Sequence, residues 1–383
     1  SRENPFDFEA TEFFVRSRMH EAGARVLEKA LEQIGRGPLA QPLVCADNHL
    51  PIRMESLGLK DKRLRTILGE VSWRRSAYQC PVCGKIRYPA DAILNVAGTG
   101  FSPGARRMMA REGAKECFRQ AAEDLEFLAH LRVDAKDVER TAENTGRMVD
   151  DWMRQQACLA TLLPPDDQPQ TLYVQFDGTG VPVRKSELAN SKGKGPDGQA
   201  RTREAKLGCV FTQTVLDEKG KPRRDPVSTS HVGAIETSTD FGYRIRAEAM
   251  RRGLRGAGRV IVLTDGAAYN KTIIQEHFPH ATHVLDHYHA KQHLADFLRE
   301  ACRLPADGPL FENMADLMWC GCSDELIRRM RQMLPRGAER RKKGEKEIRY
   351  FENNAYAMRY EEFREMGIFI GSGVIEAGCK TLI

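Results

Sequence analysis

The sequence has no apolar run of the ~18 residues that a membrane-spanning helix needs. It also lacks the apolar segment of a secretory signal, because charged residues recur throughout its first twenty positions. Cysteine is scarce, with ten among 383 residues, far below the density of disulfide-stapled domains. These absences exclude a membrane protein and a disulfide scaffold. They predict a chain of a reducing, cytoplasmic compartment whose cysteines are buried thiols or metal ligands.

The composition is that of a folded protein. Apolar residues make up 41% and charged residues 29% of the chain, which suffices for a hydrophobic core and excludes a mostly disordered protein. Lys and Arg (59) outnumber Asp and Glu (53), so the net charge is +6. The length predicts two or three domains. The chain begins with Ser and stops at Ile383 within a helical pattern, so we expect a fragment with a truncated last helix.

The N-terminal part mixes helical and β-like patterns. Apolar residues recur at helical spacing from Phe8 to Ile34, and short β-branched and aromatic stretches follow. We find no internal repeat. The predicted features are a helix over 7–36, β-like pieces over 40–95 with hairpin segments at 65–73 and 76–80, helices over 103–152 with breaks near 133–134 and at Gly146, and a linker over 164–169.

Strands and helices alternate after the linker, which predicts a mixed α/β sheet. Leu172, Val174 and Phe176 alternate with polar residues, as in a half-buried strand. A helical segment then interrupts the sheet domain, which closes near Gly371. The predicted strands are 172–176, 205–216, 226–235, 259–264 and 282–285, with helices over 240–252 and 268–278 and an almost wholly helical segment over 290–365.

Three acidic residues occupy positions that suit a site. Asp177 and Asp265 each follow a predicted strand and precede a Gly, which leaves room for a ligand beyond the carboxyl ends of the strands. Glu376 falls in the first turn of a helix expected after Gly373. Converging carboxylates repel one another unless a cation lies between them, and oxygen ligands suit Mg²⁺ or Mn²⁺. Two such ions activate phosphodiester chemistry. The residues alone leave ordinary Asp-Gly turns as an equal alternative.

Five segments extend this interpretation by resemblance. The segments are YVQFDGTGVPV, REAKLGCVF, VLTDGAAYN, DHYHAKQHL and FIGSGVIEAGCK. They resemble, in order, those of bacterial insertion-sequence DDE transposases, more narrowly the Kra-type branch that is distantly similar to Mutator-like transposases. The resemblance covers the chain from about residue 40 to its end. It implies an RNase H-like catalytic fold with a helical insertion, and Asp177, Asp265 and Glu376 as ligands of two Mg²⁺ (or Mn²⁺) ions.

The motif Asp-His-Tyr-His follows the last predicted strand. Asp286 and His289 resemble an acid-plus-histidine motif of this superfamily, which organises the metal site or contacts flanking DNA. His289 and His293 share a helix face, so a zinc site is a second interpretation. An ordinary surface helix start is a third.

A zinc site is predicted elsewhere with more support. Cys80 and Cys83 form a Cys-x-x-Cys knuckle on a predicted hairpin, and two thiolates on such a knuckle suit one tetrahedral Zn²⁺. Cys45 and His49 supply the other two ligands, although the family often carries a second cysteine pair there, which leaves the fourth ligand in doubt. No thioredoxin-like pattern surrounds the motif, which disfavours a redox role.

Basic residues predict DNA contacts. A helix-turn-helix is predicted from helices over 117–131 and 135–144, with an ordinary helical bundle as the alternative. Two basic runs, 184–206 and 336–349, flank the acidic site and suit phosphates, and the first is predicted to be a flexible loop. Trp319 either stacks on a flipped base or belongs to the core. The predicted DNA-binding residues are Lys136, Arg140, Arg184, Lys185, Lys192, Lys194, Arg201, Arg203, Arg340, Arg341, Lys342 and Lys343.

Together these features predict a DNA transposase acting on terminal repeats and target DNA as a homodimer or larger assembly, in a bacterial cytoplasm at the nucleoid. The alternatives are an RNase H-like nuclease or resolvase, and a truncated or domesticated DNA-binding protein. The predicted parts are an N-terminal helix (1–39), a zinc-ribbon-like module (40–100), a helix-turn-helix-like region (101–163), an RNase H-like core (170–289), a helical insertion (290–366) and the start of a C-terminal catalytic helix (367–383).

Overall fold

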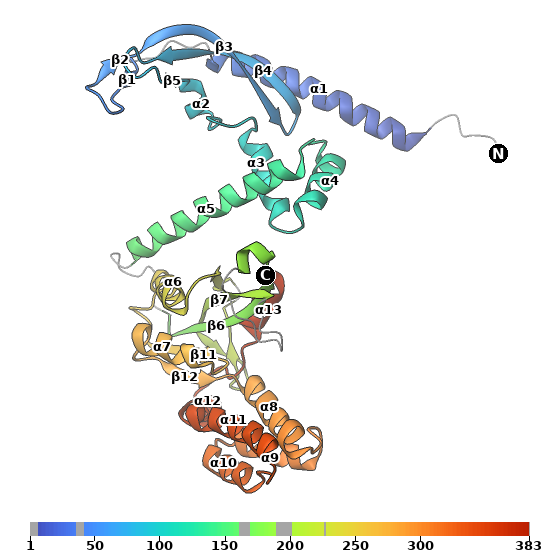
Figure 1. Ribbon diagram of the computed structural model, residues 1–383, viewed down its shortest axis with the longest axis vertical. Helices are drawn as coiled ribbons and strands as arrows, with labels where there is room; N and C mark the ends of the chain where they lie inside the picture. Colours follow the sequence, from blue (N-terminus) through green and yellow to red (C-terminus); the bar gives the residue numbers. More distant parts are fainter. Residues whose placement is uncertain (1–6, 36–41, 161–168, 189–200, 226, 383) are drawn as a thin grey trace, which may run out of the picture. The chain divides into compact units, whose positions relative to one another are not determined.

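The computed structural model describes residues 7–35, 42–160, 169–188, 201–225 and 227–382. The chain forms two compact units, residues 1–152 and 153–383 (Figure 1). No helix within the described ranges is both long enough and apolar enough to cross a membrane. The predicted linker over 164–169 lies almost wholly outside the described residues.

The first unit begins with a long helix packed on a β-hairpin. Apolar side chains of the helix, Ala24 and Leu31, are buried against Val71 and Trp73 of the hairpin. The strands form a three-stranded antiparallel sheet in the order β3-β4-β5, with a separate pair β1-β2. The elements are α1 (Phe8–Gly35), β1 (Val44–Cys45), β2 (Ile52–Arg53), β3 (Glu55–Thr66), β4 (Gly69–Gln79) and β5 (Ile86–Arg87).

The hairpin turn differs from the prediction. The turn lies at Ile67 and Leu68, before Gly69 at φ +115°, and not between 73 and 76. Gly69 adopts this left-handed conformation at little cost. Arg75, which a turn would have exposed, is buried within β4 because its guanidinium lies 2.6 Å from the Asp91 carboxylate. The two arginines predicted an exposed turn, but the ion pair with a buried acid allows Arg75 to lie inside a strand.

Four helices complete the first unit, and Val138 and Met109 anchor two of them in a common core. The helix after the predicted turn continues through Gly146 to residue 160, so the expected break at Gly146 is wrong. One glycine costs a helix about 1 kcal/mol, too little to end one this long. The elements are α2 (Pro89–Ile93), α3 (Pro103–Gly113), α4 (Phe118–Ala129) and α5 (Ala135–Ala160).

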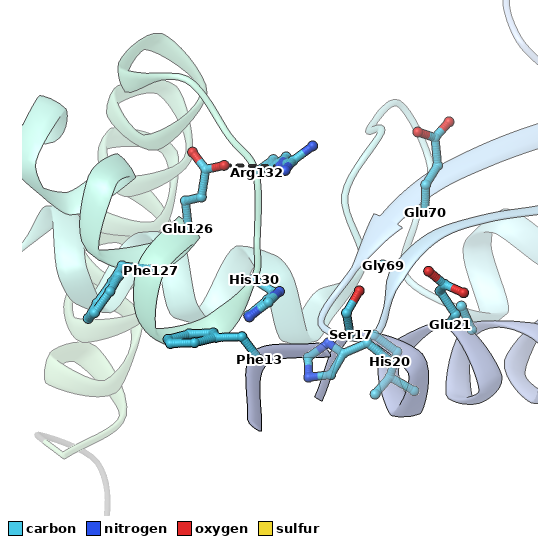
Figure 2. A pocket seen from close by; sticks show the side chains of 12 residues that line it. Phe13, Ser17, His20, Glu21, Gly69, Glu70, Glu126, Phe127, His130 and Arg132 are labelled. Carbon is cyan, nitrogen blue, oxygen red and sulfur yellow. Dashed lines mark hydrogen bonds and ion pairs between the residues drawn. The ribbon is translucent and has the colours of Figure 1, made fainter. Parts of the chain in front are cut away.

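A cavity of about 500 Å³ lies in the first unit between α1, the β3–β4 turn and the end of α4 (Figure 2). His20 and His130 face each other there with ring centroids 5.4 Å apart. Three carboxylates, those of Glu21, Glu70 and Glu126, also line it. The cavity is therefore mixed in charge.

The second unit contains a five-stranded mixed sheet in the order β10-β7-β6-β11-β12. β7 runs antiparallel to β6 and β10, whereas β11 runs parallel to β6 and β12. The strands are β6 (Thr171–Pro182), β7 (Thr202–Gln213), β10 (Ser230–Ala234), β11 (Arg259–Thr264) and β12 (Thr282–Leu285), with a small ribbon of β8 (Val215–Leu216) and β9 (Pro222–Arg223).

Two sets of helices cover the sheet (Figure 1). α6 (Ser238–Arg251) and α7 (Ala268–His277) pack on one face, where Val174 and Phe176 meet Phe241. The other face, with Tyr173 and Leu263, packs against α13 (Gly373–Leu382) and the helical segment. The strand predicted at 172–176 is present, but it is not half-buried, because helices cover both faces and Tyr173 and Gln175 are as buried as Val174.

Two predictions about the sheet are wrong. Asp177 does not end its strand, because β6 pairs with β7 as far as Pro182 opposite Thr202. The run 184–206 is not one loop, because η1 (Lys185–Leu188) opens it and β7 closes it. The pairing of β6 with β7 thus extends beyond the predicted strand end, to Pro182 and Thr202. Residues 189–200 between them, including Lys192 and Lys194, lie outside the described residues.

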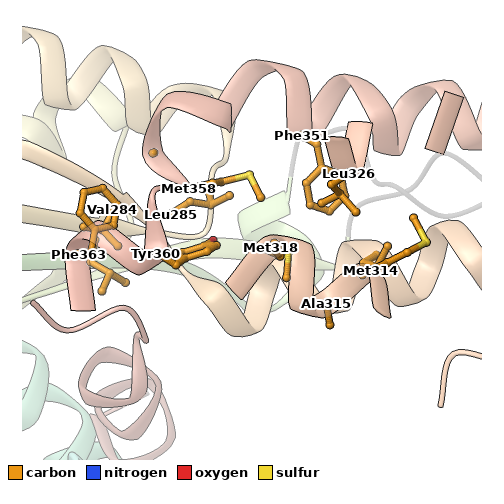
Figure 3. Close-up of a cluster of buried hydrophobic side chains, with 14 of the residues drawn as sticks. Val284, Leu285, Met314, Ala315, Met318, Leu326, Phe351, Met358, Tyr360 and Phe363 are labelled. Atoms are coloured by element: carbon orange, nitrogen blue, oxygen red, sulfur yellow. The ribbon is translucent and has the colours of Figure 1, made fainter. Parts of the chain in front are cut away.

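The predicted helical segment is present. Its core contains Met314, Met318 and Tyr360, and this core continues to Val284 and Leu285 of β12 (Figure 3). The elements are α8 (His287–Asp296), a π-helical turn η2 (Phe297–Cys302), α9 (Pro309–Trp319), α10 (Ser323–Gln332), α11 (Ala338–Asn354), η3 (Ala355–Ala357), α12 (Tyr360–Glu365) and α13 (Gly373–Leu382).

Candidate functional site

Cys45, His49, Cys80 and Cys83 form one group whose potential ligand atoms all lie within 4.8 Å of one another. The Sγ atoms of Cys45 and Cys83 are 3.8 Å apart, and Cys80 Sγ is 3.3 Å from His49 Nε2. Three thiols and one imidazole around a common point make a donor set that fits a tetrahedral metal ion.

Short turns place these ligands. The Cys80 N–H donates to the Lys85 carbonyl and the Gly84 N–H donates to the Cys80 carbonyl, which closes the knuckle. Burial opposes ionisation of Cys80, yet the N–H groups of Cys83 and Val82 lower its pKa to about 6. The knuckle therefore favours the thiolate that metals bind.

Asp47 fastens the loop between the first two ligands. Its carboxylate lies 2.9 Å from Lys85 Nζ and 2.8 Å from an Arg87 nitrogen on the other side of the group. These contacts lower the pKa of Asp47 to about 2. Sequence reasoning missed Asp47, although it lies between Cys45 and His49, because its partners are some forty residues away.

The acidic residues gather on one side of the sheet in the second unit. Asp177 lies in β6, Asp265 follows β11, and Glu376 lies in the first turn of α13, each half-buried. The tightest acidic group among the described residues contains only one of these three. It is formed by Asp286, His289 and Glu376, with ligand atoms within 4.8 Å of one another.

Asp286 is completely buried at the start of α8. Its carboxylate accepts hydrogen bonds from the backbone N–H groups of His289, at 2.7 Å, and of Ser372. The Ser372 hydroxyl in turn donates to Glu376 over 2.9 Å. These hydrogen bonds make the buried carboxylate of Asp286 a fixed point that holds the backbone of His289 and Ser372 in place.

Charge links this group to Asp177 and Asp265. Contact with Asp286, at 3.4 Å from Nδ1, raises the pKa of His289 to about 9, and the charges of Asp265 and Asp177 contribute to the rise. Burial raises the pKa of Asp177, and the charges of Asp265 and Glu376 add to that effect. The imidazolium of His289 thus offsets part of the repulsion among the carboxylates.

The glycines after the two aspartates do not leave room for a ligand, which corrects the sequence-based reason for noticing them. A Cβ atom on Gly178 would lie 2.4 Å from Glu204 Oε1, and one on Gly266 would lie 2.6 Å from Leu285. Neighbouring side chains fill both spaces. The absence of a side chain therefore allows the site to pack closely.

Nearby residues and one distant helix hold Asp265 in place. Its carboxylate accepts from the Asn270 amide at 2.7 Å and from the Ala267 N–H at 3.0 Å. Its carbonyl accepts from the Tyr350 hydroxyl of α11 at 2.9 Å. Sequence reasoning missed Asn270, Tyr350 and Ser372. Asn270, within the VLTDGAAYN segment, and Ser372, within FIGSGVIEAGCK, carried a local signal, whereas Tyr350 did not.

The predicted DNA-binding residues fall into three groups. Lys136 pairs with Glu139 and Arg140 with Asp137 on α5, and Arg341 and Lys343 pair with Glu345 and Glu300. Arg184, Lys185, Arg201, Arg203 and Lys342 are exposed, Arg340 is half-buried, and Lys192 and Lys194 lie outside the described residues. Lys206, counted in the first basic run, is buried in β7 with Nζ 2.7 Å from Glu204, so it does not face a phosphate.

Comparison with known proteins adds little to this geometry. The sequence matches no family model and no curated protein. One solved structure with a match is the Drosophila P element transposase strand transfer complex. It has 10% sequence identity and a TM-score of 0.30, over 72% of this chain and 84% of that chain. The function therefore has to be argued from the side chains.

Proposed function

We propose that this chain is a DNA transposase that cleaves and joins phosphodiesters with the help of divalent metal ions. The observation that carries the proposal is the convergence of Asp177, Asp265 and Glu376 on the group formed by Asp286 and His289. The charges of Asp265 and Glu376 act on Asp177, and the imidazolium of His289 lies among these carboxylates, which together favour the binding of hard cations.

The sheet supports an RNase H-like interpretation of the second unit. Its first three strands pair antiparallel in chain order, and the last two add in parallel beside the first. The first two carboxylates then come from neighbouring strands, β6 and β11, and the third from a helix that packs on β6 and β7. The helical segment between β12 and α13 is the proposed insertion.

The proposed chemistry follows from where these oxygens lie. Asp177, Asp265 and Glu376 would hold two Mg²⁺ or Mn²⁺ ions, which lower the pKa of an attacking hydroxyl group and stabilise a leaving oxygen. In the first step water oxygen bonds to phosphorus and the P–O3′ bond breaks, freeing a 3′ hydroxyl at the element end. In the second step that hydroxyl attacks a target phosphodiester and releases a target 3′ hydroxyl.

The remaining residues have supporting roles in the proposal. Asp286 fixes Ser372 and His289, and Ser372 orients Glu376. Exposed basic residues beside β6 and on α11 would hold DNA phosphates without reading sequence. Helices α4 and α5 would contact the terminal repeats. Cys45, His49, Cys80 and Cys83 would bind a structural Zn²⁺. Assembly into a homodimer or larger complex, and a nucleoid location, stay predictions.

The test is cleavage and strand transfer on DNA that carries the repeats flanking the gene, with Mg²⁺ or Mn²⁺. Asp265→Asn keeps the shape of the side chain and should lower both rates by at least about 1,000-fold. Glu312→Gln, an exposed carboxylate change on α9, should leave them unchanged.

Three other outcomes are informative. Cleavage without transfer would replace the transposase with an RNase H-like nuclease. Specific binding with no metal-dependent reaction would leave a DNA-binding protein. If Asp265→Asn cleaved and transferred DNA at the same rates as the parent, the carboxylates would have no role in the reaction.

A further inference from the structure

The helical segment reaches the acidic group through a side chain of α11. The Tyr350 hydroxyl donates to the Asp265 carbonyl at 2.9 Å. A Cβ atom on Gly266 would lie 3.0 Å from a carbon of the Tyr350 ring and 2.6 Å from Leu285 of β12. Gly266 has φ +85°, a conformation that residues with a side chain rarely adopt. The turn after β11 is therefore enclosed between α11 and β12.

His293 of α8 supports the Tyr350 ring from behind. The two rings are stacked, with their centroids 3.6 Å apart and their planes at 23°. The Nδ1 atom of His293 lies 2.6 Å from an oxygen of Glu347, a buried residue one turn before Tyr350 on α11. A hydrogen bond between an imidazole and a carboxylate is short and directional. Glu347 therefore fixes the orientation of the imidazole, and the imidazole fixes that of the phenol ring.

One face of α11 makes all of these contacts. Glu347, Tyr350 and Asn354 are three and four residues apart, so their side chains lie on the same side of the helix. The buried amide of Asn354 donates to the Tyr350 carbonyl at 2.9 Å. Its nitrogen also lies 3.1 Å from the position of a Cβ atom on Gly266. The end of α11 is thus built around the turn that carries Asp265.

α8 connects this arrangement to the other side of the acidic group. His289 and His293 are four residues apart on α8, and each contacts a different carboxylate. Nδ1 of His289 lies 3.4 Å from Asp286, whereas Nδ1 of His293 is bonded to Glu347. The acidic group of metal-ligand spacing includes the first histidine and not the second. The second histidine is therefore available for a different task, which is to support Tyr350.

We propose that Tyr350, supported by His293 and Glu347, holds the turn after β11 in the geometry in which the acidic group binds divalent ions. The role of those ions rests on the proposed function. The three side chains are positioning residues, because the carboxylates themselves form the metal site. Groups that orient a metal ligand commonly change metal affinity by ten- to a hundredfold. The helical segment would then complete the metal site, in addition to any contact that it makes with DNA.

The test measures binding of Mn²⁺ alone to the full chain without DNA, after Zn²⁺ has been supplied to the cysteine–histidine group. Electron paramagnetic resonance would report the unbound Mn²⁺. Tyr350→Phe keeps the stacked ring and deletes only the hydroxyl, and it should weaken Mn²⁺ binding by about tenfold. Tyr356→Phe is the matched control. It deletes a hydroxyl that lies 2.8 Å from His283 Nδ1, just after α11, and it should bind Mn²⁺ as the parent does.

A double variant tests whether the three side chains act in series. His293→Ala removes the stacked imidazole and should cause a smaller loss of Mn²⁺ affinity than Tyr350→Phe. Combining the two changes should cause no loss beyond that of Tyr350→Phe, because without the hydroxyl the imidazole has nothing to position. Two independent structural defects would instead add.

Hydrogen exchange gives a readout that needs no metal. The Ala267 N–H donates to the Asp265 carboxylate, so its protection reports the order of the turn. In metal-free Tyr350→Phe that protection should fall by about tenfold, while the amides of β11 stay protected as in the parent. The same loss in Tyr356→Phe would indicate general loosening of the helical segment and would overturn the proposal.

The remaining outcomes separate this proposal from the proposed function. Parental Mn²⁺ affinity in Tyr350→Phe would overturn it, as would losses that add in the double variant. Parental Mn²⁺ affinity in Asp265→Asn would overturn both proposals, because the ion would then lie elsewhere. If the affinities shift as expected but the parent neither cleaves nor joins DNA, the proposed function fails and the positioning role stands.

Discussion

The two candidate metal groups are built in opposite ways. The cysteine–histidine group joins two short segments, and among the described residues the buried apolar cluster around it consists of Cys45, Met54 and Cys80. Two of these three are themselves ligands. The acidic group joins β6, β11, α8 and α13 over a core that runs from the sheet through the helical segment. We therefore expect metal binding to fix the conformation of the cysteine–histidine group. In the acidic group it should balance the charge without changing the conformation.

The charges agree with this difference. Thiols can approach one another without a metal because they can stay protonated, as the 3.8 Å contact of Cys45 and Cys83 illustrates. Carboxylates at comparable distances need compensation, and here His289 and a raised pKa at Asp177 supply part of it. Packing therefore fixes the positions of the acidic side chains, whereas the repulsion between their charges is compensated only in part until cations bind.

The largest expected effect would come from removing the metal of the cysteine–histidine group. Cys80→Ser, or removal of a bound metal by a chelator, should unfold residues 42–54 and 80–88 locally, because only the ion pairs of Asp47, two short strand pairs and a small apolar cluster hold them otherwise. Hydrogen exchange should show amide protection there falling by at least about 100-fold, while β11 and β12 stay protected. Cys117→Ser, an exposed thiol at the start of α4, is the matched control. Unchanged protection without metal would refute a structural role for the group.

The second effect concerns the buried carboxylate of the acidic group. Asp286→Ala removes the acceptor of two backbone N–H groups, and it leaves the imidazolium of His289 without its partner carboxylate. Leaving these two N–H groups without their buried acceptor costs about 3 kcal/mol, so the melting temperature of the second unit should fall by roughly 10 °C. Removal of Mg²⁺ should cause no comparable loss. Calorimetry would measure both melting temperatures. If Asp286→Ala and removal of Mg²⁺ lowered the melting temperature equally, the proposed difference between the two metal groups would be refuted.

Sequence reasoning succeeded where the signal is local. The buried strands at 259–264 and 282–285 have the predicted bounds, since continuous apolar runs end at polar residues. Cys80 and Cys83 lie on the predicted knuckle beside Cys45 and His49. Sequence reasoning failed where an ion pair with another element determines the burial or secondary structure of a residue. Arg75 lies in a strand because of Asp91, and Lys206 is buried because of Glu204. No spacing rule could assign Tyr350 to Asp265.

A third test uses pH at a residue outside both groups. His283 is buried between the hydroxyls of Thr264 and Tyr356, and burial lowers its pKa to about 4. The unfolded chain binds a proton near pH 6.5, so stability is present above that pH and is lost as pH falls toward 4. Between pH 7 and 5 the loss should be roughly 2 kcal/mol.

Exchange of the β11 and β12 amides at several pH values would measure this loss. His283→Gln should flatten the dependence, because the amide can bond to both hydroxyls and does not titrate. His280→Gln, an exposed change nearby, should leave the slope as in the parent. An unaltered slope in His283→Gln would assign the acid sensitivity of the second unit to other groups, such as His287, whose pKa burial also lowers to about 4.

The smallest effect should come from a single orienting hydroxyl. Ser372→Ala deletes the 2.9 Å hydrogen bond to Glu376 and leaves the backbone N–H that Asp286 accepts. Because the core still places α13, the fold should be unaffected, and the Mg²⁺ concentration for half-maximal cleavage should rise about tenfold. Ser372→Thr retains the hydroxyl and should restore the parent value. A fall in maximal rate at saturating Mg²⁺, with no change in the half-maximal concentration, would mean that Ser372 acts on the reaction and not on the ligand.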